Sequence, residues 1–218
     1  MIRFENLTKS FWVQGERRVV IDNLNLTLPT GSSLALLGRN GAGKSTLMQM
    51  IAGTMRPDRG RITSDGTISF PVGFGGSFHG ELTGAQNTRF IARIYGVDTE
   101  ELMAFVEDFA ELGAFFYEPI RVYSSGMRSR LAFGVSMGIR FDTYLIDEVT
   151  AVGDASFRRK SQAVFRERMK TSDSILVSHD MGQIREMCSA GIVLDHGRLD
   201  VFDDLDEAIE YHRKLMLG

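Results

Sequence analysis

The 218-residue sequence predicts an α/β fold in which short strands alternate with helices around a parallel sheet. Two observations predict it. Residues 33–37 form an almost wholly apolar run, which is typical of a strand buried on both faces of a parallel sheet. Strand-like runs at 144–146 and 174–177 lie on either side of a basic helical segment at about 155–170, so strands and helices alternate again near the C-terminus.

An antiparallel β region is expected before this core. Residues 20–28 alternate, with three leucines at positions 24, 26 and 28 on one face, and a Pro-Thr-Gly turn follows. After the apolar strand comes a glycine loop and then a helix from about 44 to 52, which Gly53 ends. The runs 61–63 and 67–70 are expected to form two short strands around the turn pair Asp65-Gly66.

The middle of the chain predicts a helical lobe, at about 80–140, inserted into one nucleotide-binding domain that spans residues 1–218. Helices are expected at 86–95, after the capping residue Asp98, and after Ser124. Near the C-terminus, the runs 192–194 and 199–202 predict a hairpin around His196-Gly197, and residues 205–217 predict an amphipathic helix.

Composition excludes several classes of protein. Apolar residues make up 43% and charged residues 24%, so the chain is not disordered as a whole. The 25 basic and 28 acidic residues give a net charge of −3, which argues against a dedicated nucleic-acid binder. No apolar run reaches the roughly 18–20 residues of a membrane span, and the first residues do not form a secretory signal. A single cysteine, Cys188, fits a reducing cytoplasm.

Residues 38–45, Gly-Arg-Asn-Gly-Ala-Gly-Lys-Ser, match the phosphate-binding pattern G-x-x-x-x-G-K-[ST]. Glycines let the backbone curl so that successive N–H groups point at phosphate oxygens, and the following helix adds its positive N-terminal end. Lys44 is expected to reach the β- and γ-phosphates of ATP, and the Ser45 hydroxyl to bind Mg²⁺. The residues expected to bind the nucleotide are Gly38, Asn40, Gly41, Ala42, Gly43, Lys44, Ser45 and Thr46.

Two acids end the strand at 144–146, at the edge where α/β sheets place their ligands. Asp147 is the expected Mg²⁺ ligand and Glu148 the expected general base for ATP hydrolysis. The alternative is that both acids simply end a strand at the surface. His179 follows the strand at 174–177 and is the candidate sensor of the γ-phosphate, although a single histidine after a strand is often incidental. His79, His196 and His212 are interpreted as surface or packing residues.

The run 122–128, Val-Tyr-Ser-Ser-Gly-Met-Arg, resembles the signature sequence of ABC-type ATPases. The order of the motifs is also that family's, with Asp154 in the D-loop position and His179 in the H-loop position. The resemblance covers essentially the whole chain. It implies that two copies meet head to tail, so that Ser124, Ser125 and Gly126 of one copy cover the γ-phosphate held by the other. It also implies that Phe11 stacks on adenine; Trp12 is its rival, and a core aromatic is the alternative for either.

The sequence departs from the general family pattern in several places. Ser125 and Met127 replace the signature's first glycine and last glutamine, and Val149 replaces a common proline. The Q-loop glutamine is missing from residues 69–79, a stretch rich in glycine. These departures resemble the polysaccharide-exporting branch of the family. The segments that carry this resemblance are 71–78, 81–84, 124–127, 130–133, 147–149 and 152–154.

Within that branch the chain resembles the ATP-binding subunit of a bacterial capsular-polysaccharide exporter. It ends at Gly218, and no additional carbohydrate-binding domain is expected after the core. The resemblance implies ATP and Mg²⁺ as cofactors, separate integral-membrane permease subunits and a second copy of itself as partners, and a position at the cytoplasmic face of the inner membrane. The polysaccharide would be handled by the complex. The loop 73–84 and the helix 86–95 are expected to contact the membrane subunit.

Three alternatives stay open. The chain could energise export of another glycan, of O-antigen or teichoic acid type. A soluble ABC ATPase acting on nucleic acid is a second reading, but it would usually need a coiled-coil insertion or two tandem cores. A kinase or GTPase is a third, against which the signature and His179 argue. The basic helix at 155–170 is interpreted as a solvated face, with lipid contact as the alternative.

Overall fold

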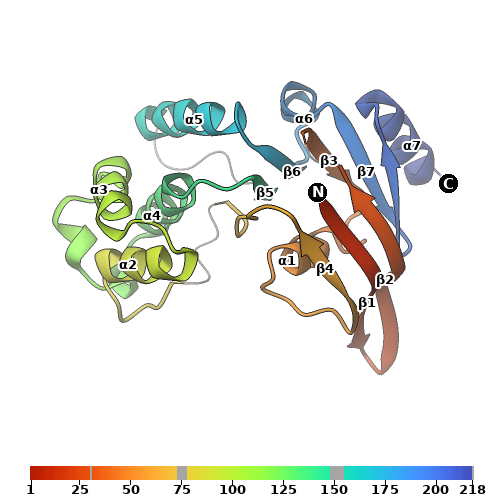
Figure 1. Ribbon diagram of the computed structural model, residues 1–218, viewed down its shortest axis with the longest axis horizontal. Coiled ribbons are helices and arrows are strands. Elements are labelled where there is room, and N and C mark those ends of the chain that lie inside the picture. Colours follow the sequence, from red (N-terminus) through yellow and green to blue (C-terminus); the bar gives the residue numbers. More distant parts are fainter. Residues whose placement is uncertain (30, 73–77, 148–154, 218) are drawn as a thin grey trace. The chain divides into compact units, whose positions relative to one another are not determined.

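In a computed structural model, which describes residues 1–29, 31–72, 78–147 and 155–217, the predicted α/β class is confirmed (Figure 1). The chain divides into two compact units. The first contains Met1–Pro71, the strand that follows Phe141, and Ser172 to the C-terminus; the second contains Val72–Arg140 and the helix that ends before Thr171. The second unit therefore draws on residues beyond the segment 80–140.

The first unit contains a five-stranded sheet in the order β5-β6-β3-β7-β8. Its strands are β3 (Ser33–Leu37), β5 (Thr143–Asp147), β6 (Asp173–Val177), β7 (Ala190–Asp195) and β8 (Arg198–Phe202). The pairings of β3 with β6 and β7, and of β5 with β6, are parallel, and only the β7–β8 hairpin is antiparallel. The apolar run 33–37 is thus the central strand, as its composition predicts.

A second sheet of the described chain has three antiparallel strands in the order β2-β1-β4, of which β1 and β2 precede β3, and β4 follows it in the chain. Its strands are β1 (Ile2–Val13), β2 (Glu16–Leu28) and β4 (Arg59–Ser64). Of the three leucines predicted to share a face of β2, Leu24 and Leu28 are buried and Leu26 is half-buried. They join one apolar core with α1 (Lys44–Ile51), β3 and β7, which fixes the antiparallel sheet against the helix that follows the glycine loop.

Residues 67–70 do not form the predicted strand beside β4, and this expectation was wrong. β4 pairs with β1 instead, while Ile68 makes an isolated parallel bridge to Thr143. The Thr67 backbone N–H and hydroxyl each donate to Asp142 Oδ2 at 2.7 Å, and the Thr143 N–H donates to the Thr67 carbonyl at 3.0 Å. The two bonds from Thr67, first the backbone N–H and then the hydroxyl, hold the pKa of the Asp142 carboxyl below its ordinary value. The segment therefore runs along the edge of β5, where its backbone groups find partners that a hairpin would not supply.

The second unit is helical. It contains α2 (Gly84–Tyr95), α3 (Thr99–Ala110), α4 (Ser125–Gly138), α5 (Ala155–Met169) and two short 3₁₀ turns, η2 (Gly113–Tyr117) and η3 (Ile120–Val122). The predicted caps are present: the Asp98 side chain accepts from the Glu101 N–H, and Ser124 accepts from the Met127 N–H. Thr83 and Gln86 form a reciprocal capping box at α2.

The core of this unit is aromatic. Phe109 of α3 is 2% exposed and packs against three other rings, with centroids 5.6 Å from Phe105, 5.8 Å from Phe133 and 5.2 Å from Phe157. A Cβ atom at Gly134 of α4 would lie 3.2 Å from the Phe109 ring, so the absence of a side chain there admits this ring between the two helices. Phe109 therefore joins α3, α4 and α5.

The C-terminal part of the chain follows the prediction, with one addition. The β7–β8 hairpin turns at His196 and Gly197, whose φ angles are 43° and 80°. The chain closes with α7 (Leu205–Leu217), as expected. A short helix, α6 (Met181–Met187), which Asp180 caps, was not predicted. Over the described residues, no helix is both long and apolar enough to cross a membrane.

Replacement of Phe109 by alanine is expected to lower the free energy of unfolding by about 3–5 kcal/mol, because it empties a ring-sized volume between three helices. Phe115→Ala, which removes a half-exposed ring from the same unit, should cost less than about 1 kcal/mol. Urea denaturation followed by circular dichroism measures both. Equal losses for the two variants would contradict the central position of Phe109.

Candidate functional site

The glycine loop joins the central strand β3 to α1, and its shape depends on two neighbouring strands. Gly43, with φ at 111°, is the N-cap of α1, and a Cβ atom on it would lie 2.0 Å from Val20 Cγ1. A Cβ atom on Gly38 would lie 2.5 Å from the Leu194 carbonyl oxygen. The Ala42 N–H donates to the Arg39 carbonyl at 3.0 Å and closes a turn. Only glycine fits at positions 38 and 43, so the motif reflects packing as well as phosphate chemistry.

Lys44 lies over this loop. Its Nζ donates to the Gly38 carbonyl at 2.7 Å and to the Arg39 carbonyl at 3.2 Å. The ammonium group is therefore held above the curled backbone, at the mouth of the loop. An anion that entered the loop would meet a positive charge already in place, together with the N-terminal end of α1.

A cavity of about 470 Å³ opens in front of the loop and brings most of the predicted site together. It contains Asn40, Gly41, Gly43, Lys44, Ser45 and Thr46 from the loop and α1, and the predicted residues Phe11, Asp147 and His179 from other elements; Val13, Arg18, Val20 and Val177 complete its lining. Gly38 and Ala42 do not line it. The Gly38 carbonyl nevertheless positions a residue of the cavity, because it accepts a hydrogen bond from Lys44.

Asp147 and His179 come to this cavity because β5 and β6 run parallel to β3. Asp147 ends β5 and is in register with Val177, which ends β6, and His179 follows two residues later. The carboxyl ends of parallel strands meet at one edge of a sheet, so the two side chains lie beside the loop that leaves β3. An oxygen ligand and an imidazole thus line the same cavity as the lysine.

The donors at this edge fit a magnesium ion. Mg²⁺ prefers oxygen ligands and keeps several of its waters, usually taking one or two protein groups together with phosphate oxygens. The Ser45 hydroxyl and the Asp147 carboxylate both line the cavity. Within the described residues there is no cluster of three or more His, Cys, Asp or Glu that would hold a metal without a phosphate ligand.

Strand alternation separates the two candidate adenine-stacking residues. Phe11 of β1 is half-buried and lines the cavity, with the Lys9 ammonium 5.3 Å from its ring centre. Trp12 points to the other face of the strand and is 76% exposed. The lining of the cavity therefore includes Phe11 but not Trp12.

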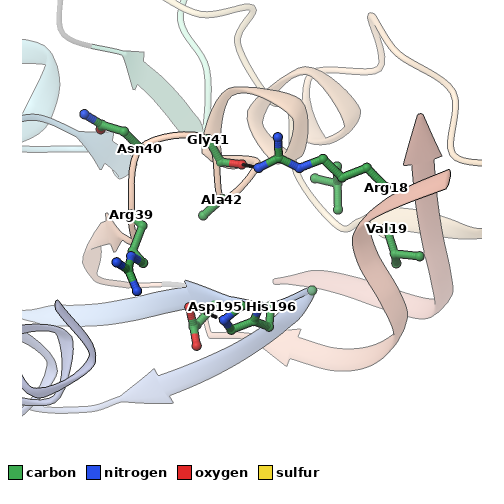
Figure 2. Close-up of a pocket in the computed structure, with 10 residues that line it drawn as sticks. Arg18, Val19, Arg39, Asn40, Gly41, Ala42, Asp195 and His196 are labelled. Atoms are coloured by element: carbon green, nitrogen blue, oxygen red, sulfur yellow. Dashed lines mark hydrogen bonds and ion pairs between the residues drawn. The ribbon is translucent and has the colours of Figure 1, made fainter. Parts of the chain in front are cut away.

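Arg18 and Val20 were not anticipated from the sequence. Both lie on β2, and Arg18 stands opposite Phe11 in the β1–β2 ladder. They line the front cavity and a second cavity of about 410 Å³, together with residues 39–42 and the turn 195–197 (Figure 2). The one sequence signal for them is that alternate residues of a strand share a face, so residues paired with Phe11 would face the same cavity. That signal can be used only when the register of the β1–β2 hairpin is known.

The remaining histidines differ in their surroundings. The His196 side chain is exposed at the β7–β8 turn, 3.9 Å from Asp195. The His79 backbone N–H donates to Asn87 Oδ1 and its Nδ1 accepts from the Glu81 N–H, so it organises the start of α2. Burial, and secondarily the positive charge of Lys44, lowers the pKa of His212 on α7.

The signature residues lie in the helical unit. Ser124 caps α4, Ser125 begins it, and both are exposed together with Gly126. A cavity of about 620 Å³ in this unit is lined by Glu111, Leu112, Phe115, Ser124, Gly126, Met127 and Arg130. An exposed helix N-terminus beside this cavity fits the predicted contact with phosphate. Glu148, Val149, Asp154 and residues 73–77 of the glycine-rich stretch lie outside the described residues.

The family model described as ABC transporter matches residues 21–151, which include the loop and the signature. This chain belongs to the ABC transporter family. Membership makes it an ATP-binding protein and an ATPase, as the motif resemblance predicts.

Relatives of this ABC protein match over almost the whole chain. It is 48% identical over 216 residues to the polysialic acid transport ATP-binding protein KpsT of Escherichia coli, covering 98% of this chain and 96% of that protein. It is 44% identical to the capsule polysaccharide export ATP-binding protein CtrD of Neisseria meningitidis serogroup B, covering 99% and 100%. The O-antigen export system ATP-binding protein RfbB of Klebsiella pneumoniae is 38% identical, with coverage of 94% and 85%.

Solved structures of other ABC proteins have the same fold. A dimeric ATP-binding cassette in a post-hydrolysis state, bound to ADP and Pi, matches with a TM-score of 0.71 and 20% identity. The match covers 92% of this chain and 98% of that structure. At this identity the match identifies the fold.

Replacement of Lys44 by alanine is expected to weaken ATP binding by about 10- to 100-fold, because it removes a charged hydrogen-bond donor from the mouth of the loop. The exposed Lys214→Ala on α7 should bind ATP normally. Titration with a fluorescent ATP analogue compares the two. Unchanged affinity of Lys44→Ala would contradict its assignment as a phosphate ligand.

Proposed function

We propose that the chain is the ATP-binding and ATP-hydrolysing subunit of an ABC transporter that exports capsular polysaccharide across the bacterial inner membrane. The observation that carries the proposal is full-length similarity, at 44–48% identity, to two proteins named for polysialic acid transport and capsule polysaccharide export. The lower identity to an O-antigen export protein makes another glycan the second choice. No nucleic-acid substrate is proposed.

Each predicted site residue has a role, and for those that the structure describes the lining of the front cavity supports it. The loop amides and Lys44 bind the β- and γ-phosphates, and Phe11 stacks on adenine. Ser45 and Asp147 would hold Mg²⁺, which would neutralise charge on the transferred phosphoryl group. His179 contacts the γ-phosphate from the end of β6. Glu148, the residue after Asp147, orients and deprotonates the attacking water.

The working form is a head-to-tail dimer in which the two units of each chain act as one ABC ATPase domain. The signature cavity supports this, since Ser124 and Gly126 line an open pocket next to a helix N-terminus. Ser125, and Asp154 in the D-loop, complete the trans contact. The dimeric state of the ADP- and Pi-bound relative is consistent with it. ATP then joins the two copies, and hydrolysis releases them.

Separate permease subunits supply the membrane path, and the ATPase binds them at the cytoplasmic face of the inner membrane. α2 supplies the docking surface. Only part of its apolar face is buried: Ile91 is buried, whereas Phe90 is 55% and Ile94 60% exposed. Large exposed apolar side chains on one helix are typical of a contact surface. Residues 78–83, the described end of the loop that is expected to contact the membrane subunit, lead directly into α2.

In cells that carry the intact exporter, Lys44→Ala should leave polysaccharide in the cytoplasm and abolish the surface coat. Glu148→Gln should give the same phenotype while the purified variant still binds ATP, because it removes the base and leaves the phosphate loop intact. Immunolabelling of capsule on whole and on permeabilised cells measures the distribution. A normal coat on Lys44→Ala cells would refute export of this polymer, and loss of O-antigen with an intact capsule would favour the second choice.

Charge placed on α2 should uncouple the ATPase from its membrane partner. Phe90→Glu combined with Ile94→Glu is expected to reduce co-purification with the permease at least tenfold, since two carboxylates would be desolvated at the contact. Met216→Glu, an equally exposed apolar position on α7, is the matched control. Unimpaired co-purification of the α2 variant would show that the permease docks elsewhere.

A further inference from the structure

Arg18 makes a contact with the phosphate-binding loop that none of the roles above uses. It lies on β2, opposite Phe11 of β1, and its Nη2 donates to the Gly41 carbonyl at 2.9 Å. Figure 2 shows the side chain reaching from the strand to the loop. Within the described chain, this is the one hydrogen bond that the Arg18 guanidinium makes.

The bond fixes one corner of the loop. Gly41 has a φ of 78°, and its carbonyl belongs to the same peptide as the Ala42 N–H, which donates to the Arg39 carbonyl at 3.0 Å. Arg18 therefore holds one side of the 41–42 peptide while the turn holds the other. The orientation of this peptide determines which way the neighbouring amides face, and amides that face inward are what a phosphate requires.

Lys44 and Arg18 both donate to carbonyls of the loop, but only Lys44 is also the predicted phosphate ligand. Lys44 donates to the Gly38 and Arg39 carbonyls, and the phosphate oxygens of a nucleotide would compete for the same ammonium group. The Gly41 carbonyl faces the strand, so its bond to Arg18 can persist. Two residues further along β2, the Val20 side chain occupies the space that a side chain at position 43 would need. β2 thus supports the loop at two points, one polar and one apolar.

We propose that Arg18 is a positioning residue that holds the phosphate-binding loop in its binding conformation with and without nucleotide. The proposal rests on the proposed function only where it concerns the binding of ATP; the effect of Arg18 on the shape of the loop does not depend on that function. A clamp on the loop acts on every ligand whose phosphates the loop binds. It therefore predicts equal effects on ATP and ADP, whereas a direct contact with the γ-phosphate would affect ATP alone.

The test compares Arg18→Met, which keeps the apolar stem without a donor, with Arg18→Lys, which keeps a charged donor. Arg17→Met is the matched control, because Arg17 points to the other face of β2 and donates to Ser10 Oγ at 3.2 Å. Hydrogen exchange of nucleotide-free protein is measured by mass spectrometry. Arg18→Met should accelerate exchange in peptides covering residues 38–46 and not elsewhere, and Arg18→Lys should restore most of the protection. Unchanged exchange in this segment would overturn the proposal.

Nucleotide affinity and steady-state kinetics then distinguish a clamp from other roles. Arg18→Met should raise the dissociation constants of ATP and ADP by the same factor, about tenfold, and raise KM while kcat at saturating ATP changes less than about threefold. Weakened binding of ATP alone, or failure of Arg18→Lys to rescue, would overturn the proposal. A general fall in thermal stability would do the same. Failure of the wild-type chain to bind ATP would count against the proposed function, and the exchange measurement would still judge the clamp.

Discussion

The parallel pairing of β5, β6 and β3 is the constraint on which the site depends. Because β3 is central and its neighbour β6 pairs with β5 in the same direction, the loop after β3, Asp147 at the end of β5 and His179 after β6 share one edge. No hydrogen bond between these side chains is needed to bring them together. The backbone hydrogen bonds between these strands, which are covered by an apolar core, bring the side chains together. The site residues can therefore be held rigidly without themselves stabilising the fold.

The antiparallel sheet adds a second constraint on the loop. Phe11, Arg18 and Val20 lie on one face of the β1–β2 ladder, and that face meets the loop. The loop is thus shaped by contacts from β2 and from Leu194 of β7 before any nucleotide arrives. A loop held in this way loses little conformational freedom when it binds phosphate, which favours affinity.

Several parts of this arrangement could be predicted from the sequence because they follow from local pattern. The apolar run 33–37, the glycine loop and the caps at Asp98 and Ser124 are each encoded within a few neighbouring residues. Register is not encoded locally. The choice between Phe11 and Trp12, the contribution of Arg18, and the course of residues 67–70 all depend on which strand lies beside which. Residues 67–70 show the difference plainly, since a good turn pair precedes them and a carboxylate on the distant Asp142 decides where they go.

The path of residues 67–70 along the edge of β5 has a consequence for solubility. β5 is one of the two outer strands of the five-stranded sheet, and an outer strand offers unpaired backbone groups to any other chain. Here the Thr143 N–H and carbonyl are bonded to Thr67 and Ser69, and the Ser69 hydroxyl accepts from the Leu145 N–H. Residues 67–69 therefore occupy the backbone hydrogen-bonding groups at the start of the outer edge of β5. A newly made copy that has folded this far no longer presents β5 as a template for edge-to-edge aggregation.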